Sequence, residues 1–475
     1  MNERETLVGI ATGTPDGGVA VVRLSGPRAV AIAEGLAGSV GEARRLVRRR
    51  LRVEDRDGVD AFDPSRPGVA DEVREASAYE DALVAFMPGP NSFTGEDVVE
   101  LHVHGGETNV RQIVEALLDA GAVAAGRGEF TRRAFENGRL SLDQAEGIAA
   151  VIGAQTRAAL GQARRLVAGE LGREVRALAD RLHRLHVEIE ANLDFPDDVD
   201  DDANERWADE SQAVRGELER WLGRFEAGRR AREIPRVVLG GSPNAGKSSL
   251  FNALLGRERA LVADRPGTTR DFVEARLDLG RHAVELVDTA GVREVTPDAI
   301  EAAGIALSRT QLEGADLVVW LVGPEELEAR VELPEWLREG ELPGTTGCEL
   351  WVVASQRDRG ASGGDPVGRG DARLAVSVRE TESVERLRDA LHDWARGGDR
   401  APWIGLARHR DCARASTEAL MEAEGLLRRD GALELVAFSM MTAVARLREI
   451  DGGHQLGPVG DEVLDSIFSS FCIGK

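Results

Sequence analysis

The N-terminal part of the chain alternates hydrophobic and polar residues. Short alternating stretches at 17–25, 80–90 and 97–106 predict half-buried strands that end at Gly or Pro. Apolar residues at helical spacing over 110–121 predict one helix among these strands. We therefore expect an α+β domain over residues 1–138.

The rest of the chain is helical, with one interruption. Residues 139–233 and 402–475 carry the pattern of long amphipathic helices, broken at 194–202 by a proline and clustered aspartates. Residues 234–401 instead alternate buried strands with helices, which is typical of a doubly wound α/β domain. We predict a multidomain protein in which a discontinuous all-α domain, in two halves, flanks an inserted α/β domain.

The composition limits the class of protein. No apolar run approaches the roughly 18 residues of a membrane helix, and the N-terminus lacks the basic-then-apolar pattern of a signal peptide. The cysteines Cys348, Cys412 and Cys472 are widely spaced, which disfavours a disulfide framework or a cysteine zinc site. We expect a cytoplasmic protein without a membrane segment.

Charge and the choice of basic residues add two observations. The net charge of −23 argues against a protein that coats nucleic acid through bulk charge. The basic run at 45–52 is more typical of a solvated face than of a nucleic-acid patch. Of the 60 basic residues, two are lysines, Lys247 and Lys475. Where arginine is the default cation, a lysine indicates a need for a compact ammonium group.

A phosphate-binding loop opens the α/β domain. GSPNAGKSS at 241–249 matches G-x-x-x-x-G-K-[ST], follows a predicted strand and begins a predicted helix, as this motif requires. Backbone N–H groups can surround the phosphates, Lys247 can reach the β and γ oxygens, and Ser248 can hold Mg²⁺. The loop residues that we predict to bind nucleotide are Asn244, Ala245, Gly246, Lys247, Ser248 and Ser249.

Two further motifs follow in the order that a GTPase requires. GTTRD at 267–271 offers Thr269 to complete the Mg²⁺ shell. DTAG at 288–291 offers Asp288 to hold Mg²⁺ through water and the Gly291 N–H to meet the γ-phosphate. A kinase or a dinucleotide dehydrogenase would need different loops. The same predicted nucleotide-binding set includes Thr268, Thr289 and Ala290.

The base-reading motif departs from the usual pattern. Where a GTPase has N-K-x-D, this chain has Ser355-Gln356-Arg357-Asp358, and the following S-A-x motif reads Ser377-Val378-Arg379. Asp358 can still accept hydrogen bonds from guanine N1–H and its exocyclic amine. The missing Asn and Lys remove a base contact and the side chain that packs over the base. We expect guanine preference with weakened affinity; the alternative is a degenerate pocket that tolerates other purines.

The residue that orients the attacking water is not the usual glutamine. The residue after DTAG is Val292, which cannot orient water as the glutamine of Ras-like enzymes does. Glu294, Asp298 and Glu301 are acidic candidates for that role. Asn244 either binds a second cation that replaces an arginine finger or forms a loop-stabilising Asx turn.

With these motifs in place, the chain resembles the MnmE (TrmE) family of tRNA-modification GTPases along essentially its whole length. Era- and Der-type GTPases share only the central motifs. The other segments that carry the resemblance are GGVAVVRLSG (17–26), PGPNSFTGEDVVELHVHGG (88–106), GEFTRRAFENGRLSLDQAE (128–146), LDFPDD (193–198) and LDSIFSSFCIGK (464–475). The resemblance implies a folate-binding N-terminal domain, a helical domain in two halves, an inserted G domain, and a homodimer whose G domains pair across K⁺.

The resemblance also implies ligands for ions and water. Asn244 matches the family's K⁺ ligand, and the backbone carbonyls of Ala263, Arg265 and Thr268 would complete that shell. Glu301 falls on the family's water-orienting glutamate. A K⁺ ion between the β- and γ-phosphates would stabilise transition-state charge as an arginine finger does.

A folate pocket is implied at Arg23, Glu100, Arg139 and Lys475, with Arg139 where Lys is usual. Arg and Lys would pair the glutamate carboxylates of 5-formyltetrahydrofolate or a related tetrahydrofolate, and Glu100 would read pterin N–H donors. Without the resemblance, Arg23 and Glu100 could equally form an ordinary surface ion pair.

Three more residues have competing interpretations. Cys472 resembles the family's cysteine near the modification site, and the alternative is a small buried hydrophobe. His102 and His104 alternate on a predicted strand and are better explained as structural residues than as metal ligands.

The implied function is a K⁺-activated, Mg²⁺-dependent GTPase that works with an MnmG-like flavoprotein, which carries FAD, in a heterotetramer. The pair would add a carboxymethylaminomethyl-type group to the wobble uridine of certain tRNAs, with one carbon from tetrahydrofolate. Two rivals stay open: a ribosome-assembly GTPase of the Era or Der type, and a non-hydrolysing folate- or nucleotide-binding scaffold.

Overall fold

The computed structural model divides the chain into two compact units. Unit 1 comprises Met1–Ala149, Arg165–Arg184 and Val444–Lys475, and unit 2 comprises Ala150–Arg164 and Leu185–Ala443. The residues that the structure describes are 5–12, 17–53, 79–194, 203–241, 245–256, 273–288, 315–323, 348–356, 375–396, 404–429, 431–453, 460–469, 471 and 474.

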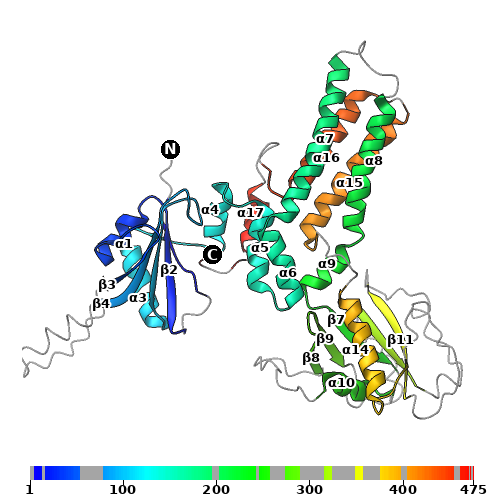
Figure 1. The fold of residues 1–475 in the computed structure, drawn as a ribbon, viewed down its shortest axis with the longest axis horizontal. Helices are drawn as coiled ribbons and strands as arrows, with labels where there is room; N and C mark the ends of the chain where they lie inside the picture. The colour runs from blue at the N-terminus through cyan, green and yellow to red at the C-terminus, as the bar shows by residue number, and fades with distance from the viewer. Residues whose placement is uncertain are drawn as a thin grey trace, which may run out of the picture. The chain divides into compact units, whose positions relative to one another are not determined.

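Unit 1 contains a six-stranded sheet with strand order β3-β4-β5-β2-β1-β6. Its strands are β1 (Leu7–Ile10), β2 (Val19–Ser25), β3 (Leu46–Arg52), β4 (Tyr79–Met87), β5 (Val98–His104) and β6 (Val123–Ala124). Neighbouring strands are antiparallel except for β1 and β6, which are parallel. Helices α1 (Ala29–Ala37) and α3 (Glu107–Asp119) cover one face (Figure 1), where Val22, Leu24 and Leu101 are fully buried.

The alternation along these strands decides what the other face carries. Side chains of successive strand residues point to opposite faces, so Arg23 lies on the face opposite Val22 and Leu24. Glu100, beside Leu101 in the sequence, is the register partner of Arg23 on β5. The sheet therefore presents two charged residues in its interior, on the face away from α1 and α3.

Helices complete unit 1. They are α4 (Glu129–Glu136), the larger part of α5 (Leu142–Gly153), the first half of α7 (Glu170–Asp194), the end of α16 (Leu433–Arg448) and α17 (Asp461–Ser469). Asp143 accepts a hydrogen bond from the Gly172 N–H at 3.0 Å, and Arg176 pairs with Asp451 at 3.0 Å. Phe468 and Phe471 join a buried apolar cluster with Leu142. The C-terminal helix is thus packed within the unit that contains the N-terminal sheet.

Unit 2 contains a second six-stranded sheet, with strand order β12-β11-β10-β7-β9-β8. Its strands are β7 (Arg236–Gly241), β8 (Val273–Asp278), β9 (Ala283–Asp288), β10 (Leu317–Val322), β11 (Glu349–Ser355) and β12 (Ala375–Val376). All pairs are parallel except β8 with β9. Helices α10 (Lys247–Leu255) and α14 (Thr381–Arg396) pack on one face of this sheet (Figure 1). The prediction of an α/β domain over this region is confirmed.

The remaining helices of unit 2 come from both sides of the α/β domain in the sequence. They are the first part of α6 (Arg157–Val167), the second half of α7, α8 (Ala203–Leu222), α9 (Phe225–Arg232), α15 (Ala407–Leu427) and the first half of α16. Arg215 of α8 pairs with Glu424 of α15 at 2.9 Å, and the Trp207 Nε1–H donates to Glu188 of α7 at 3.0 Å. Helices that precede and follow the α/β domain therefore pack against each other.

Four of the described strands, β1, β3, β6 and β8, were not predicted. The basic run at 45–52 is β3, an edge strand that pairs with β4 from Leu46↔Ala85 to Arg52↔Tyr79. Arginines at four of its seven positions hide the hydrophobic–polar alternation that identifies a strand. No helix in the described ranges is long and apolar enough to span a bilayer.

Candidate functional sites

The predicted phosphate loop joins the central strand β7 to helix α10. Gly246 adopts φ +90°, a conformation that glycine tolerates best, and it directly precedes the first helical residue, Lys247. The Lys247 Nζ donates to the Gly241 carbonyl at 2.8 Å, so the ammonium reaches back to the last residue of β7. Ser248 and Ser249 are exposed in the first turn, where backbone N–H groups lack helical partners. This arrangement suits a polyphosphate.

Asp288 lies at the same edge of the sheet. Strand β9 runs parallel to β7 with Asp288 beside Leu239, two residues before Gly241. The Asp288 side chain is buried, with 4% of the residue exposed. A carboxylate and a hydroxyl are oxygen donors of the kind that Mg²⁺ prefers. Ser248 and Asp288 therefore fit a Mg²⁺ site by the chemistry of their side chains.

The altered base-reading motif begins at the end of β11. The buried Ser355 hydroxyl donates to the Val322 carbonyl at 3.1 Å, so it holds two strand ends together. Gln356 adopts φ +54°, and its Nε2 lies 3.8 Å from where a Cβ on Gly246 would sit. Gln356 thus lies beside the phosphate loop, a contact that the sequence did not predict.

The second altered motif forms a tight turn before α14. The Ser377 N–H donates to the Ser383 hydroxyl at 2.9 Å, and the Arg379 N–H donates to the Ser377 hydroxyl at 3.3 Å. Val378 is exposed. Since β12 pairs with β11 at Ser355↔Val376, this turn lies next to the end of β11. The ends of β7, β9, β11 and β12 therefore meet at one edge, as a ligand site of this fold requires.

The other residues predicted for these sites lie outside the described part of the chain. They are Asn244, Ala263, Arg265, Thr268, Thr269, Thr289, Ala290, Gly291, Glu301, Asp358, Cys472 and Lys475. Their roles stay predictions.

The N-terminal candidate site centres on an ion pair within the sheet of unit 1. Arg23 Nε and Nη2 donate to Glu100 Oε1 at 3.0 and 2.8 Å, and both side chains are less than one-fifth exposed. The Arg23 guanidinium lies 5.2 Å from the ring centroid of Phe93 and 5.7 Å from that of Phe130. His102 Nε2 lies 3.5 Å from the other Glu100 oxygen. Two aromatic rings thus flank a partly desolvated cation, and neither ring was predicted.

A buried polar network holds the loop that carries Phe93. The Ser25 hydroxyl contacts the Thr94 hydroxyl at 2.7 Å and donates to Glu96 at 2.8 Å. Arg133 of α4 pairs with Glu96 at 3.2 Å. The third predicted residue of the site, Arg139, donates from Nε to the Ser92 carbonyl at 3.2 Å. The structure therefore attaches Arg139 to the loop whose aromatic ring packs on Arg23.

The end of the chain reaches this part of unit 1. Gly474 adopts φ +89°, and a Cβ added there would overlap the Ile10 carbonyl, so only glycine fits without displacement. Its Cα also lies close to Gly9, which is the register partner of Arg23 on β1. The residue before the predicted Lys475 is thus seated beside the strand that pairs with β2.

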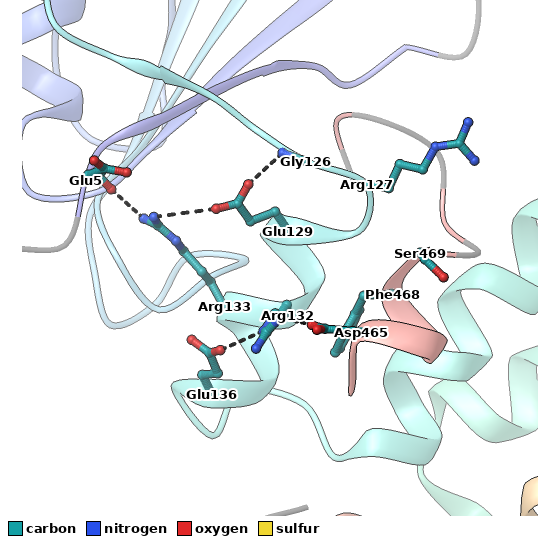
Figure 2. Close-up of a pocket in the computed structure, with 10 residues that line it drawn as sticks. All are labelled: Glu5, Gly126, Arg127, Glu129, Arg132, Arg133, Glu136, Asp465, Phe468 and Ser469. Atoms are coloured by element: carbon teal, nitrogen blue, oxygen red, sulfur yellow. Dashed lines mark hydrogen bonds and ion pairs between the residues drawn. The ribbon is translucent and has the colours of Figure 1, made fainter. Parts of the chain in front are cut away.

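A cavity of about 500 Å³ lies elsewhere in unit 1, lined by α4 and α17 (Figure 2). Arg132 pairs there with Glu136 at 3.0 Å and with Asp465 at 2.7 Å, and the Gly126 N–H donates to Glu129 at 2.6 Å. No residue of the predicted sites lines this cavity. Because these charges pair with one another, we assign the cavity no ligand.

The two histidines of β5 have protein partners. The His104 ring contacts Glu80 at 2.9 Å, and His102 faces Glu100. Within the described residues, no group of three or more His, Cys, Asp or Glu side chains could hold a metal ion. The structural interpretation of both histidines agrees with these contacts.

The parallel sheet with a G-x-x-x-x-G-K-S loop after its central strand defines a P-loop nucleotide-binding protein. Residues 6–139 match the family described as GTP-binding protein TrmE N-terminus, and residues 142–472 match the family described as MnmE helical domain. The chain belongs to the MnmE family.

Relatives match over the full length of the chain. A protein of Halorhodospira halophila named "tRNA modification GTPase MnmE" is 40% identical over 100% of this chain and 96% of its own length. Proteins of the same name from Myxococcus xanthus and Heliobacterium modesticaldum are 39% and 37% identical, each over 99% of both chains.

Proposed function

We propose that this chain is a K⁺-activated, Mg²⁺-dependent GTPase that acts in tRNA modification. With an MnmG-like flavoprotein it adds a carboxymethylaminomethyl-type group to the wobble uridine of certain tRNAs. The observation that carries the proposal is the phosphate-loop sequence between β7 and α10, whose lysine, the one internal lysine of the chain, reaches back to the Gly241 carbonyl. Full-length relatives named for the same activity support it. The proposed domains are 1–138, 234–401, and a helical domain made of 139–233 and 402–475.

The proposed nucleotide site divides its work among distinct groups. Ser248 and Thr269 hold Mg²⁺, which neutralises phosphate charge when it is bound. Lys247 and the first N–H groups of α10 bind the phosphates. Glu301 orients the attacking water, because Val292 has no polar atom to do so. The proposed K⁺ ligands are Asn244 and the carbonyls of Ala263, Arg265 and Thr268.

Guanine recognition falls to the altered motifs. Asp358 accepts from the base, as in other GTPases. The proposed neighbours at the ends of β11 and β12 are Gln356, in place of the usual lysine, and the turn at Ser377, Val378 and Arg379. A neutral amide beside the phosphate loop stabilises a bound nucleotide less than an ammonium would, so we expect guanine preference at reduced affinity.

The N-terminal site is proposed to bind 5-formyltetrahydrofolate or a related tetrahydrofolate. Arg23, Arg139 and Lys475 pair its carboxylates, and Glu100 accepts from pterin N–H groups. Support comes from the partly desolvated Arg23–Glu100 pair, whose guanidinium lies between the rings of Phe93 and Phe130. Aromatic rings beside polar groups are typical of sites that bind heterocycles. Cys472 is a candidate residue at the modification site.

The proposed assembly is a homodimer through the N-terminal domains, joined to the FAD-carrying flavoprotein in a heterotetramer. Val19 and Leu83, on neighbouring parts of the unit 1 sheet, are 60% and 45% exposed. Exposed apolar side chains on the sheet face away from α1 and α3 support a protein contact there.

Steady-state GTP hydrolysis in KCl and in NaCl, at matched ionic strength, tests the proposal. We expect hydrolysis to be about tenfold or more faster in KCl, because a fixed cation at the phosphates stabilises developing charge. Asn244→Ala should remove the difference between the salts and keep nucleotide binding. Equal rates in both salts would remove the K⁺ mechanism. Nucleotide binding without turnover would favour a scaffold, the reading that Ser355-Gln356 makes possible.

A further inference from the structure

Arginines crowd the edge of the unit 1 sheet. Residues 44–52 contain six of them, at 44, 45, 48, 49, 50 and 52. Most of these residues belong to β3, which lies at the end of the strand order and has a described sheet neighbour, β4, on one side. The side chains of Arg45, Arg48 and Arg50 are 73–74% exposed. We call these three residues the arginine strip.

Negative charge near the strip is sparse in the described ranges. Arg45 pairs with Glu42 at 3.0 Å, whereas Arg48 and Arg50 share Asp81 at 3.0 and 3.9 Å. The hydrogen bond from Arg48 holds the pKa of Asp81 below its usual range. Asp81 is therefore ionised at neutral pH, yet one carboxylate cannot neutralise two guanidinium groups.

The flanking arginines add to the positive charge. Arg44 donates to the Asn91 carbonyl at 2.5 Å, and Arg49 donates to the Ser39 carbonyl at 2.6 Å. Backbone carbonyls carry no net charge, so these bonds orient the guanidinium groups without neutralising them. Among the described residues, arginines at this edge thus outnumber the carboxylates that pair with them, in a chain whose net charge is −23.

An aromatic ring lies in the same region. Tyr79 is the register partner of Arg52, is 39% exposed, and has the Arg50 guanidinium 5.9 Å from its ring centroid. Directly opposed residues of paired strands share a sheet face. Arginines beside an exposed aromatic ring on a sheet supply the two contacts that bind unpaired nucleotides, to phosphates and to a stacked base.

Protection of an exposed edge strand explains the arginines of β3 less well than nucleic-acid binding does. A few charges suffice to keep an edge strand from pairing with another chain. Same-face residues on a strand are about 6.8 Å apart, so the like charges of Arg48 and Arg50, which share the single carboxylate of Asp81, repel one another. A bound polyanion would relieve that repulsion. The structure thus favours the nucleic-acid interpretation that the sequence alone ranked second.

We propose that the arginine strip, with Tyr79, binds the phosphates and one base of an unpaired segment of tRNA. The inference rests on the proposed function for the identity of the RNA. The contact is electrostatic and independent of base sequence, so it would hold the tRNA without selecting it.

The test is the salt dependence of tRNA binding by the full chain. The probe is unfractionated tRNA, titrated between about 50 and 200 mM KCl, the range over which phosphate contacts weaken strongly. For Arg45→Gln/Arg48→Gln/Arg50→Gln we expect the slope of log K against log[salt] to fall by about 2, since each phosphate contact contributes about 0.7 on single strands. GTP hydrolysis should not change.

A second triple variant controls for net charge. Arg386→Gln/Arg428→Gln/Arg446→Gln removes three arginines that are 51–53% exposed and lie in ion pairs elsewhere. This variant should keep the wild-type slope. A fall of the same size in both variants would overturn the proposal, as would a wild-type chain that does not bind tRNA at 50 mM KCl.

Single variants keep the test informative if the triple variant does not fold. Arg48→Gln alone should lower the slope by about 0.7. Tyr79→Leu should weaken binding of a single-stranded oligonucleotide about fivefold or more, at an unchanged slope, because it removes one stacking surface.

Two further results distinguish RNA binding by the arginine strip from edge protection and from the proposed GTPase mechanism. An unchanged slope together with self-association of the triple variant, seen by light scattering, would assign the arginines to edge protection and overturn RNA binding. The K⁺ experiment is independent: its failure with the slope change intact would remove the proposed GTPase mechanism and leave the RNA surface standing.

Discussion

The two candidate sites of this chain are built in opposite ways. The nucleotide site lies where parallel strands end, and its phosphate loop is one contiguous segment at 241–249. The N-terminal site lies within strands: Arg23 and Glu100 are 77 residues apart and meet because β2 and β5 pair in register. One site uses backbone N–H groups and a lysine, whereas the other uses side chains from separate segments.

This difference has a consequence for mutation. A site made of backbone groups depends strongly on its few functional side chains, whereas a site made of separate segments also depends on the contacts that bring them together. Changes in the phosphate loop should therefore affect one activity sharply. Changes far from Arg23 in the sequence should still affect the N-terminal site.

The largest effect is expected at Lys247. Lys247→Ala removes the ammonium that donates to the Gly241 carbonyl. Loss of one charged donor at developing phosphate charge should slow GTP hydrolysis about 100-fold or more. The measurement is kcat under saturating GTP, with circular dichroism to show that the fold is retained.

The chain's other lysine provides a matched control. Lys475→Ala removes the same charge, and we expect it to leave GTP hydrolysis unchanged and to weaken folate binding. If both variants lost hydrolysis alike, the two sites would not be separable and the comparison would fail.

The same contrast explains what the sequence could predict. The phosphate loop was predicted from local spacing, because a strand, a glycine turn and a helix start occupy consecutive residues. The Arg23–Glu100 pair depends on strand register between distant segments, so only the family resemblance pointed to it. Phe93 and Phe130 carried no local signal at all, since an aromatic beside a cation becomes recognisable only once the loop and α4 are placed.

The sequence pattern did not predict strand β3, for a different reason. Its burial alternates, but Leu51 is its one buried residue and arginines stand at four of its seven positions. Period-two reasoning needs one buried face, and an edge strand with little burial does not provide it. Likewise, the contact of Gln356 with the phosphate loop follows from where β7 and β11 end, and residue types alone do not encode that proximity.

The next largest effect is expected at Arg23. Arg23→Gln should weaken binding of 5-formyltetrahydrofolate about 10- to 100-fold, because hydrogen bonds to charged groups contribute roughly 1.5–3 kcal/mol. GTP hydrolysis should stay at the wild-type rate. The measurement is isothermal titration calorimetry with the folate.

Arg132→Gln is the control for Arg23. Arg132 also lies in unit 1 and pairs with two carboxylates, Glu136 and Asp465, but it lines the cavity at α17. Its loss should not change folate affinity. Equal affinity of Arg23→Gln and the wild type would make Arg23–Glu100 an ordinary ion pair.

The smallest effect is expected at Gly474, where the change lies at the far end of the chain. An alanine there must adopt φ +89° and place its Cβ against the Ile10 carbonyl. A left-handed conformation costs a non-glycine residue about 1–2 kcal/mol, so the terminal segment should detach part of the time. If seating of Lys475 contributes to the N-terminal site, Gly474→Ala weakens folate binding about tenfold, which is what 1.4 kcal/mol corresponds to.

Gly460→Ala separates this effect from a general loss of glycine. No atom lies within contact distance of a Cβ at Gly460, and its backbone is not left-handed. This variant should bind folate like the wild type. In Gly474→Ala, hydrogen exchange at β1 should rise together with the loss of affinity, because the Ile10 backbone loses its cover. Faster exchange without weaker folate binding would show that the docked C-terminus stabilises β1 and takes no part in the site; in that case the N-terminal site would resemble the nucleotide site in depending only on its nearest residues.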